Sequence, residues 1–354
     1  MRFFLVLFVA LPFLMLMAEA AKLSVVEVLT NSSPGVSGLL GAYDVKITSD
    51  GRFVYVSSDG DNTTVVFSRD APTGKLTFVQ MYTHSFHALN CYLSPDDLYL
   101  YTAGAVYHTA MPGYITVFQR DTTTGRISPI QQLNQGLSGY GLILSGSPDG
   151  SFLYMGMGSA IAVFRRNRFS GQLTLLEAFT TPGDAGYAVV ATADHLYSAG
   201  DQGVMAFNRS QTNGLLVPIQ TLLNGSPGAD WISVYGDQGQ TVVIGAYYPS
   251  GGLTTFQRSP TTGLLRFKQL ITNQQVRDMS SVAVVLVSQS GDYMFVGGNV
   301  LDVLNVNPTT GDLSPSTIPS DATGSGGIGL VQFEKFLYYV CDGSSSLVVY
   351  SWEE

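Results

Sequence analysis

Residues 49–80 read SDGRFVYVSSDGDNTTVVFSRDAPTGKLTFVQ, and this stretch decides the fold. It contains three apolar runs, Phe53–Val56, Val65–Phe67 and Leu76–Val79, with Asp- and Gly-rich segments between them. Short apolar runs bounded by Asp-Gly and Thr-Gly pairs are typical of antiparallel strands joined by tight turns. The stretch therefore predicts three consecutive strands connected by hairpins.

The same pattern returns along the whole chain. Each copy closes with a small polar residue followed by glycine, at Gly74, Gly125, Gly171, Gly214, Gly263 and Gly311, and successive glycines are 43 to 51 residues apart. Four strands in every 40–50 residues are the signature of propeller blades. The first six predicted blades span residues 43–81, 88–133, 140–178, 186–222, 231–271 and 281–318.

The two ends of the chain complement each other. Lys22–Leu29 reads KLSVVEVL and matches KLTFVQM at 75–81, which is the fourth strand of a blade. Near the other end, Ile328–Phe333, Phe336–Cys341 and Leu347–Ser351 form three strands without a fourth. We predict an all-β, seven-bladed β-propeller with four antiparallel strands per blade, in which the N-terminal strand completes the last blade and leaves no open sheet edge.

The first twenty residues differ from the repeat. Arg2 is followed by an apolar run and then by Ala18-Glu19-Ala20, which is the pattern of a secretory signal peptide. The run is shorter than the roughly 20 residues that a membrane span needs, although an uncleaved anchor is the alternative. We predict cleavage near Ala20, a single propeller domain over residues 21–354, and a secreted, extracellular protein.

Secretion agrees with four Asn-x-Ser/Thr triplets, which predict a glycoprotein with sites at Asn31, Asn62, Asn208 and Asn224. The chain has two cysteines, Cys91 and Cys341. They fall in predicted blades 2 and 7, which are not neighbours, whereas a disulfide needs Cα atoms within about 7 Å. We therefore expect two buried thiols rather than a disulfide.

Composition limits the class of partner. The 354 residues are 45% hydrophobic and 12% charged, which is enough apolar material for a core and argues against disorder. The formal net charge is −9 and no basic stripe occurs, so we expect no binding to nucleic acid, and none to membranes once the signal peptide is cut. We expect a monomer.

The blade pattern Ser-Pro-Asp-Gly at 147–150, a strand ending in Phe-Ser-Arg-Asp at 67–70 and a Thr-Gly-x-Leu turn resembles the lactonase-type seven-bladed propeller family, which includes 6-phosphogluconolactonase and carboxymuconate cyclase-like proteins. The resemblance implies a site of His, Arg and Glu residues around the mouth of the central channel. His87 looks like the family's histidine before the inner strand of the second blade, and Arg277 is placed to hold a lactone carboxylate or phosphate. After the second strand the family often has Asn-Glu or Asn-Arg-Gly, whereas this chain has Ser-Ser-Asp-Gly at 57–60 and Gly-Asn-Val at 298–300.

Several residues are candidates for a site at that mouth. Histidine readily acts as a base near neutral pH, so His87 and His84 are the candidate catalytic bases, with Arg277 as the stabiliser of an oxyanion. The candidate substrate-binding residues are Asp230, Asp278 and Tyr248. The alternative interpretation is that these are ordinary loop histidines, turn-capping aspartates and aromatic residues packed between blades.

Two functions from different classes remain open. The first is a lactone hydrolase acting on a small sugar-type lactone, and the alternative is a non-catalytic secreted propeller that binds a carbohydrate-like ligand or an extracellular protein. We expect no cofactor. We also expect no metal site, because neither a His-Glu-x-x-His nor a Cys-x-x-Cys pattern occurs.

Overall fold

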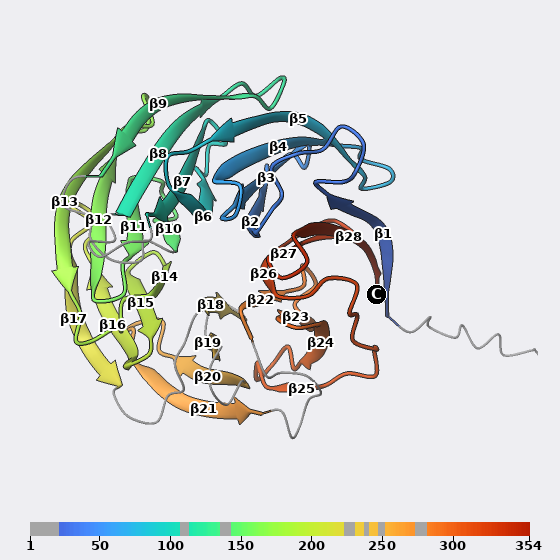
Figure 1. Cartoon of the computed structure of the whole chain (residues 1–354). Coiled ribbons are helices and arrows are strands. Elements are labelled where there is room, and N and C mark those ends of the chain that lie inside the picture. The colour runs from blue at the N-terminus through green and yellow to red at the C-terminus, as the bar shows by residue number, and fades with distance from the viewer. Residues whose placement is uncertain are drawn as a thin grey trace, which may run out of the picture.

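The computed structural model describes residues 21–106, 113–134, 143–222, 231–236, 241–246, 252–272 and 282–354. These residues form seven four-stranded antiparallel sheets, which stand like blades around a common centre (Figure 1). The described residues contain no helix, and therefore none that could cross a membrane. The predicted seven-bladed β-propeller is confirmed.

Each blade is a meander whose first strand lies nearest the centre and whose last strand lies at the rim (Figure 1). Blade 1 contains β2 (Ala42–Ile47), β3 (Phe53–Ser58), β4 (Thr63–Arg69) and β5 (Leu76–Thr83). Blade 2 contains β6 (His87–Leu93), β7 (Tyr99–Ala105), β8 (Gly113–Arg120) and β9 (Ile127–Leu133). Blade 3 contains β10 (Leu144–Gly146), β11 (Phe152–Gly156), β12 (Ala160–Arg166) and β13 (Leu173–Thr180). Blade 4 contains β14 (Ala188–Ala191), β15 (His195–Gly200), β16 (Gly203–Arg209) and β17 (Leu216–Leu222).

The remaining three blades follow the same order. Blade 5 contains β18 (Trp231–Tyr235), β19 (Thr241–Ala246), β20 (Gly252–Arg258) and β21 (Leu265–Ile271). Blade 6 contains β22 (Val284–Val287), β23 (Tyr293–Gly297), β24 (Leu301–Val306) and β25 (Leu313–Pro315). Blade 7 contains β26 (Gly327–Phe333), β27 (Phe336–Cys341), β28 (Ser346–Glu353) and, from the other end of the chain, β1 (Lys22–Thr30). Blade 6 ends at Pro315 instead of residue 318, where proline has no N–H to extend the ladder.

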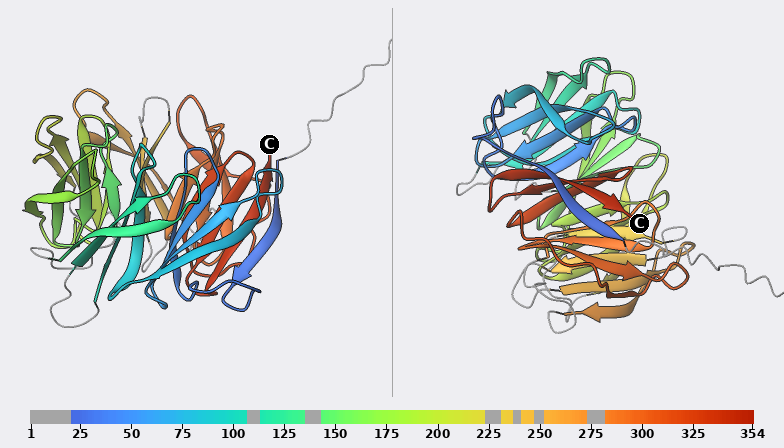
Figure 2. Two further views of the ribbon diagram at one scale, coloured as in Figure 1. Left: turned by 90° about the horizontal axis from the view of Figure 1, so that it is seen from above. Right: turned by 90° about the vertical axis from the view of Figure 1, so that its right-hand side faces the viewer.

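The ring closes through its two ends, as predicted. Strand β1 pairs antiparallel with β28 from Lys22 opposite Glu353 to Thr30 opposite Ser346. Figure 2 shows β1 in blue lying across the red strands of blade 7. The first described strand thereby becomes the rim strand of the last blade, so β28 is paired on both sides and blade 7 has four strands like the other blades.

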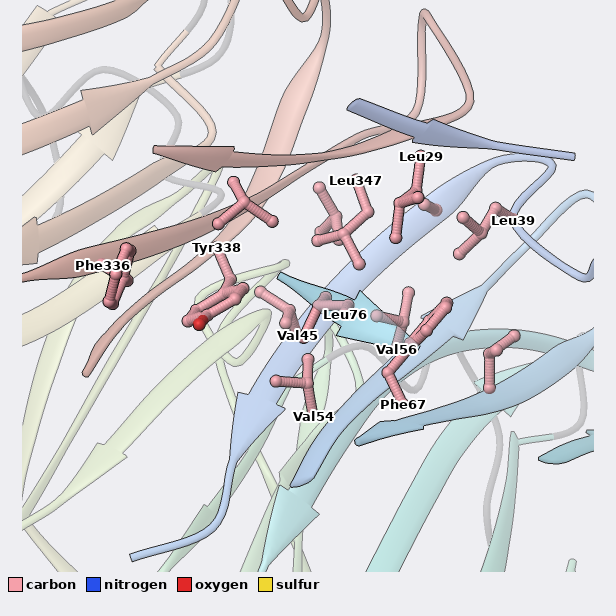
Figure 3. Close-up of a cluster of buried hydrophobic side chains, with 14 residues drawn as sticks. Leu29, Leu39, Val45, Val54, Val56, Phe67, Leu76, Phe336, Tyr338 and Leu347 are labelled. Carbon is pink, nitrogen blue, oxygen red and sulfur yellow. The ribbon is translucent and has the colours of Figure 1, made fainter. Parts of the chain in front are cut away.

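Apolar clusters between neighbouring blades form the core. The cluster between blades 7 and 1 includes Leu29, Val45, Phe67, Tyr338 and Leu347, all buried (Figure 3). Every residue of β3 and of β27 is buried, because the second strand of a blade is covered by a neighbouring blade on each face. This explains why these strands read as continuous apolar runs and not as an alternating pattern.

A repeated polar contact also joins the blades. Tyr55 in β3 donates its hydroxyl proton to the carbonyl of Gly125 in blade 2 (2.8 Å), and Arg120 of blade 2 donates Nε–H to the same hydroxyl (2.5 Å). We call this contact the Arg–Tyr latch. It recurs as Tyr101–Gly171–Arg166, Tyr197–Gly263–Arg258 and, between blades 7 and 1, Tyr338–Gly74–Arg69. Gly125 has φ +74° and a Cβ there would overlap the ring of Phe53, so the turn requires glycine.

A second repeated contact lies near the rim. The side-chain amide of Gln80 in β5 accepts from Ile127 N–H and donates to the Ile127 carbonyl, both at 3.0 Å. The same two-bond contact is made by Gln131 with Leu173, Gln220 with Leu265 and Gln269 with Leu313. In β1 the corresponding residue is Glu27, which accepts a single bond from Leu76 N–H at 3.0 Å. Side chains therefore tie five of the seven pairs of neighbouring blades together in these two ways, in addition to apolar packing.

Candidate active site

Successive strands of a blade run in opposite directions, so the connections between them lie alternately at the two ends of the blade. Connections that enter a first strand and connections that join a second strand to a third lie at the same end of every blade; we call this end the mouth face. In blades 7, 1 and 2 these connections contact one another. Gly41 N–H, in the connection that enters β2, donates to Ser345 Oγ of blade 7 (3.2 Å), and Asp59 N–H donates to the carbonyl of Gly41 (2.8 Å). These bonds hold the mouth-face connections of blades 7 and 1 together.

A histidine and an aspartate pair at this face. His87 begins β6, the inner strand of blade 2, and its Nδ1 lies 2.6 Å from Oδ1 of Asp59, which follows β3 of blade 1. A carboxylate accepts hydrogen bonds, so Nδ1 carries the proton and Nε2 is the basic nitrogen of the ring. The side chains are 34% and 24% exposed, so solvent and a small ligand reach them. This pair can abstract and return a proton.

The backbone around His87 explains its position. Strand β6 has an irregular register between Ala88 and Asn90, directly after His87. Gly104 of the neighbouring strand β7 lies against the His87 carbonyl, where a Cβ would overlap it. The absence of a side chain at Gly104 lets β7 support the start of β6 at this close distance.

A second carboxylate stands beside the pair. Asp342 lies in the connection between β27 and β28, and its Oδ1 approaches the position that a Cβ on Gly41 would occupy. Partial burial and the charge of Asp59 together raise the pKa of Asp342 above its usual value. Asp342 and Asp59 therefore lie close enough at the junction of blades 7 and 1 for their carboxylates to interact.

His84 has a different environment. It is buried, with Nε2 at 2.8 Å from Thr64 Oγ1 and Nδ1 at 3.3 Å from Thr116 Oγ1. Its ring packs against Phe86 and Phe118 at centroid distances of 4.6 and 5.7 Å. Burial lowers the pKa of His84 to about 3, so it is neutral in the folded protein. These contacts suit a packing residue between blades 1 and 2 and do not suit a base.

A polar network that sequence reasoning did not find connects three inner strands beneath the mouth. Asp44 of β2 accepts bonds from Lys46 Nζ (2.6 Å), Asn90 Nδ2 (2.7 Å) and Cys91 N–H (3.0 Å). Asn90 Oδ1 in turn accepts from Leu144 N–H of blade 3 at 2.9 Å. The feature of the sequence that could have predicted this network is a charged or amide residue inside an otherwise apolar inner strand. The network holds the inner strands of blades 1 to 3 in register.

Comparison with known proteins identifies the family. The family model described as "Lactonase, 7-bladed beta-propeller" matches residues 12–139 and 145–354. The chain belongs to this family. A comparison with curated protein sequences found no match.

Solved structures of similar shape include proteins described as a gluconolactonase and as putative 6-phosphogluconolactonases. The periplasmic gluconolactonase PpgL of Pseudomonas aeruginosa is 20% identical, with a TM-score of 0.70 over 85% of this chain and 88% of that one. Putative 6-phosphogluconolactonases of Bacteroides uniformis and Bacteroides fragilis are 18% and 17% identical, both with TM-scores of 0.63. They cover 77% and 89% of this chain, and 83% and 87% of their own chains are covered. At these identities the likeness shows the fold alone.

The other predicted substrate-binding and catalytic residues lie in parts of the chain that the structure does not describe. Arg277, Asp230, Asp278, Tyr248 and the sequon residue Asn224 lie outside the described residues. Among the residues that the structure does describe, no three His, Cys, Asp or Glu side chains come together as a metal site. Cys91 and Cys341 are both buried and free, so the predicted pair of thiols is confirmed.

The three described sequon residues differ in how their side chains are used. Asn31 donates Nδ2–H to Asp61 (2.8 Å) and accepts Leu39 N–H (2.7 Å), so its amide already holds two loops together. Asn62 has φ +57° and a buried Oδ1. Asn208 lies in β16 with an exposed side chain. Of these three, Asn208 presents the most accessible amide.

Proposed function

We propose that this propeller hydrolyses a small lactone at its mouth face, with His87 as general base and Asp59 as the residue that orients it. The observation that carries the proposal is the 2.6 Å contact between His87 Nδ1 and Asp59 Oδ1 at a partly exposed position of the inner ring. A carboxylate on Nδ1 fixes the tautomer and stabilises the imidazolium that forms when Nε2 takes a proton. Membership of the lactonase family supports the choice of substrate class.

The chemistry needs one base and one site for an oxyanion. His87 Nε2 removes a proton from a water molecule as the water oxygen attacks the lactone carbonyl carbon. The carbonyl becomes a tetrahedral oxyanion, which we assign to Arg277 for stabilisation. When the intermediate collapses, the bond between the carbonyl carbon and the ring oxygen breaks, and the imidazolium returns its proton to that oxygen. The product is the open-chain hydroxy acid.

Further roles belong to the same proposal. We assign substrate binding to Asp230, Asp278 and Tyr248, and a packing role to His84. We also propose that residues 1–20 are a signal peptide, so that the protein is a secreted, glycosylated monomer. Support for cleavage near Ala20 comes from strand β1, which begins at Lys22 and pairs along its length with β28. N-terminal sequencing of protein recovered from the culture medium tests this point, and a product that begins at Met1 contradicts it.

The test of catalysis is turnover of a panel of five- and six-membered lactones by wild type and variants. We expect His87→Ala to lower kcat/KM by about 10²–10⁴-fold. Asp59→Asn should lower it at least about tenfold while changing the pH profile, because an amide no longer fixes the tautomer. The matched control is Asp292→Asn, an exposed aspartate in the turn between β22 and β23 at the opposite end of the blade.

Two outcomes contradict the proposal in different ways. If the His87→Ala protein is folded and turns over lactones as the wild type does, His87 is not the base, but the lactonase function is unaffected. Absence of turnover on every lactone favours the alternative, a non-catalytic propeller that binds a carbohydrate-like ligand or an extracellular protein.

A further inference from the structure

The junction between blades 4 and 5 has a histidine in a position that an aromatic residue takes at other junctions. The residue two positions before a second-strand tyrosine lies against the turn glycine of the neighbouring blade. Four of these residues are phenylalanine or tyrosine: Phe53 beside Gly125, Tyr99 beside Gly171, Phe152 beside Gly214 and Phe336 beside Gly74. Between blades 4 and 5 the residue is His195, whose imidazole lies beside Gly263. A ring that can take up a proton near neutral pH therefore packs inside this junction.

His195 also bonds the arginine of the Arg–Tyr latch. Nη2 of Arg258 lies 3.3 Å from His195 Nδ1 and 3.4 Å from Thr192 Oγ1, while Nε–H of Arg258 donates to the Tyr197 hydroxyl at 2.8 Å. Arginine has only donors, so Nδ1 must accept, and the neutral imidazole carries its proton on Nε2. The contact between His195 and Arg258 therefore requires an uncharged histidine.

The described charged and titratable groups near His195 come from three strands and one turn. Arg258 of β20 faces it across the junction, and Tyr197 lies on its own strand at a centroid distance of 6.4 Å. Asp194 precedes it in the turn after β14, and Arg209 of β16 donates to two backbone carbonyls of that same turn. The facing turn at 259–264 contains no ionisable side chain. Two arginines and one aspartate among these groups disfavour a further positive charge on the imidazole.

Acid acts on this junction with a definite sign. Burial lowers the pKa of His195 below its ordinary value of 6.5, the charge of Arg258 lowers it further, and Asp194 acts in the opposite direction. The opened junction therefore binds a proton at His195 at a higher pH than the closed junction does. The stability that the neutral imidazole contributes is complete above pH 6.5 and is lost as the pH falls through the lower value of the closed state.

We propose that the junction between blades 4 and 5 is an acid-sensitive seam, which loosens when His195 takes up a proton from the solvent. The proton binds Nδ1, which then no longer accepts from Arg258 and places a second positive charge 3.3 Å from Nη2. His195 is only 3% exposed, so water screens this repulsion poorly. The repulsion disturbs the Tyr197–Gly263–Arg258 latch. This inference does not depend on the proposed lactonase function.

Hydrogen–deuterium exchange of the whole protein at pH 7 and pH 5, corrected for the intrinsic effect of pH on exchange, measures the loosening. The reporter is the turn at 259–264, where the amides of Ser259 and Gly263 are bonded at 2.9 and 2.8 Å. The reference is the equivalent turn of blade 3 at 167–172, where Tyr99 takes the position of His195. We expect protection of the reporter turn to fall by about three- to tenfold from pH 7 to pH 5, and protection of the reference turn to stay constant.

Two variants test whether His195 is the group that titrates. His195→Phe places an aromatic ring beside Gly263, and His195→Gln keeps a hydrogen-bond acceptor for Arg258. Neither side chain takes up a proton in this range, so both variants should show the same protection at pH 7 and pH 5. The matched control is His84→Gln, which removes a buried histidine between blades 1 and 2 and should leave the loss at the reporter turn unchanged.

Three results would overturn the inference. The first is equal protection of the reporter turn at the two pH values in the wild type. The second is an equal loss at the reference turn, because acid then acts on the whole ring and not on one seam. The third is a loss that persists in either folded His195 variant, because another group is then responsible.

Discussion

Replacing Tyr338 by Phe removes one hydroxyl group from the Arg–Tyr latch that joins blade 7 to blade 1. That hydroxyl donates to the Gly74 carbonyl (3.0 Å) and accepts from Arg69 Nε–H (2.6 Å). A neutral bond contributes about 1 kcal/mol and a bond to a charged group about 1.5–3 kcal/mol. Because the Arg69 side chain is only 2% exposed, water does not replace the lost partner. We expect the free energy of unfolding to fall by about 2–4 kcal/mol.

The neighbouring residue supplies the control. Tyr339 is equally buried, but its hydroxyl's partners among the described residues are neutral backbone groups: Gly298 N–H (3.0 Å), the Gly298 carbonyl (3.2 Å) and the Val300 carbonyl (3.5 Å). Tyr339→Phe should therefore cost about 1–2 kcal/mol. Urea unfolding followed by fluorescence measures both values. A cost for Tyr338→Phe equal to or below that of Tyr339→Phe refutes the reasoning that the latch stabilises ring closure.

Three further predictions concern the rim strand, the buried histidine and the sequons. Glu27→Gln should stabilise the fold by about 0.5–1 kcal/mol, because an amide can also donate to the Leu76 carbonyl as the other rim glutamines do; an unchanged urea midpoint contradicts this. The pKa of His84 is about 3 in the folded protein, below its ordinary value of 6.5. Between pH 3 and pH 6.5 the unfolded chain therefore binds a proton at His84 that the folded protein does not bind. Stability should therefore fall as pH drops from 6.5 towards 3, by up to about 1 kcal/mol per pH unit, and His84→Gln should flatten this slope; equal slopes contradict the assignment. In a secretory host, site-resolved mass spectrometry should find glycan on Asn208 and little on Asn31, and the reverse occupancy contradicts the accessibility argument.

The fold could be predicted from the sequence because each repeat contains recognisable strand and turn patterns. The Thr-Gly and Asn-Gly pairs predict turns, and the structure shows the reason in the positive φ of each glycine. A ring fills the space beside Gly74, Gly125, Gly214 and Gly263, and the side chain of Thr241 does so beside Gly311. The match between KLSVVEVL and KLTFVQM predicted closure because the two strands occupy the same place in their blades.

The site was less accessible to sequence reasoning. The role of His87 as a base stays a prediction; its contact with Asp59 was not predicted, because the two residues come from different blades and sequence spacing does not report a contact across an interface. His84 and His87 stand three residues apart, yet one lies inside the inter-blade packing and the other at the mouth. Inter-blade packing decides such a difference, and it is not visible in a single repeat.

The pairing of β1 with β28 also affects how the protein is made. Ser24 and Ser351 are bonded partners that are 327 residues apart in the chain. A ribosome delivers the first of these strands long before the second, so β1 has no pairing partner in the nascent chain until β28 has been synthesised. Loss of the eight residues of β28, Ser346–Glu353, removes the partner of β1, and we expect chains that terminate before β28 to aggregate instead of forming six stable blades.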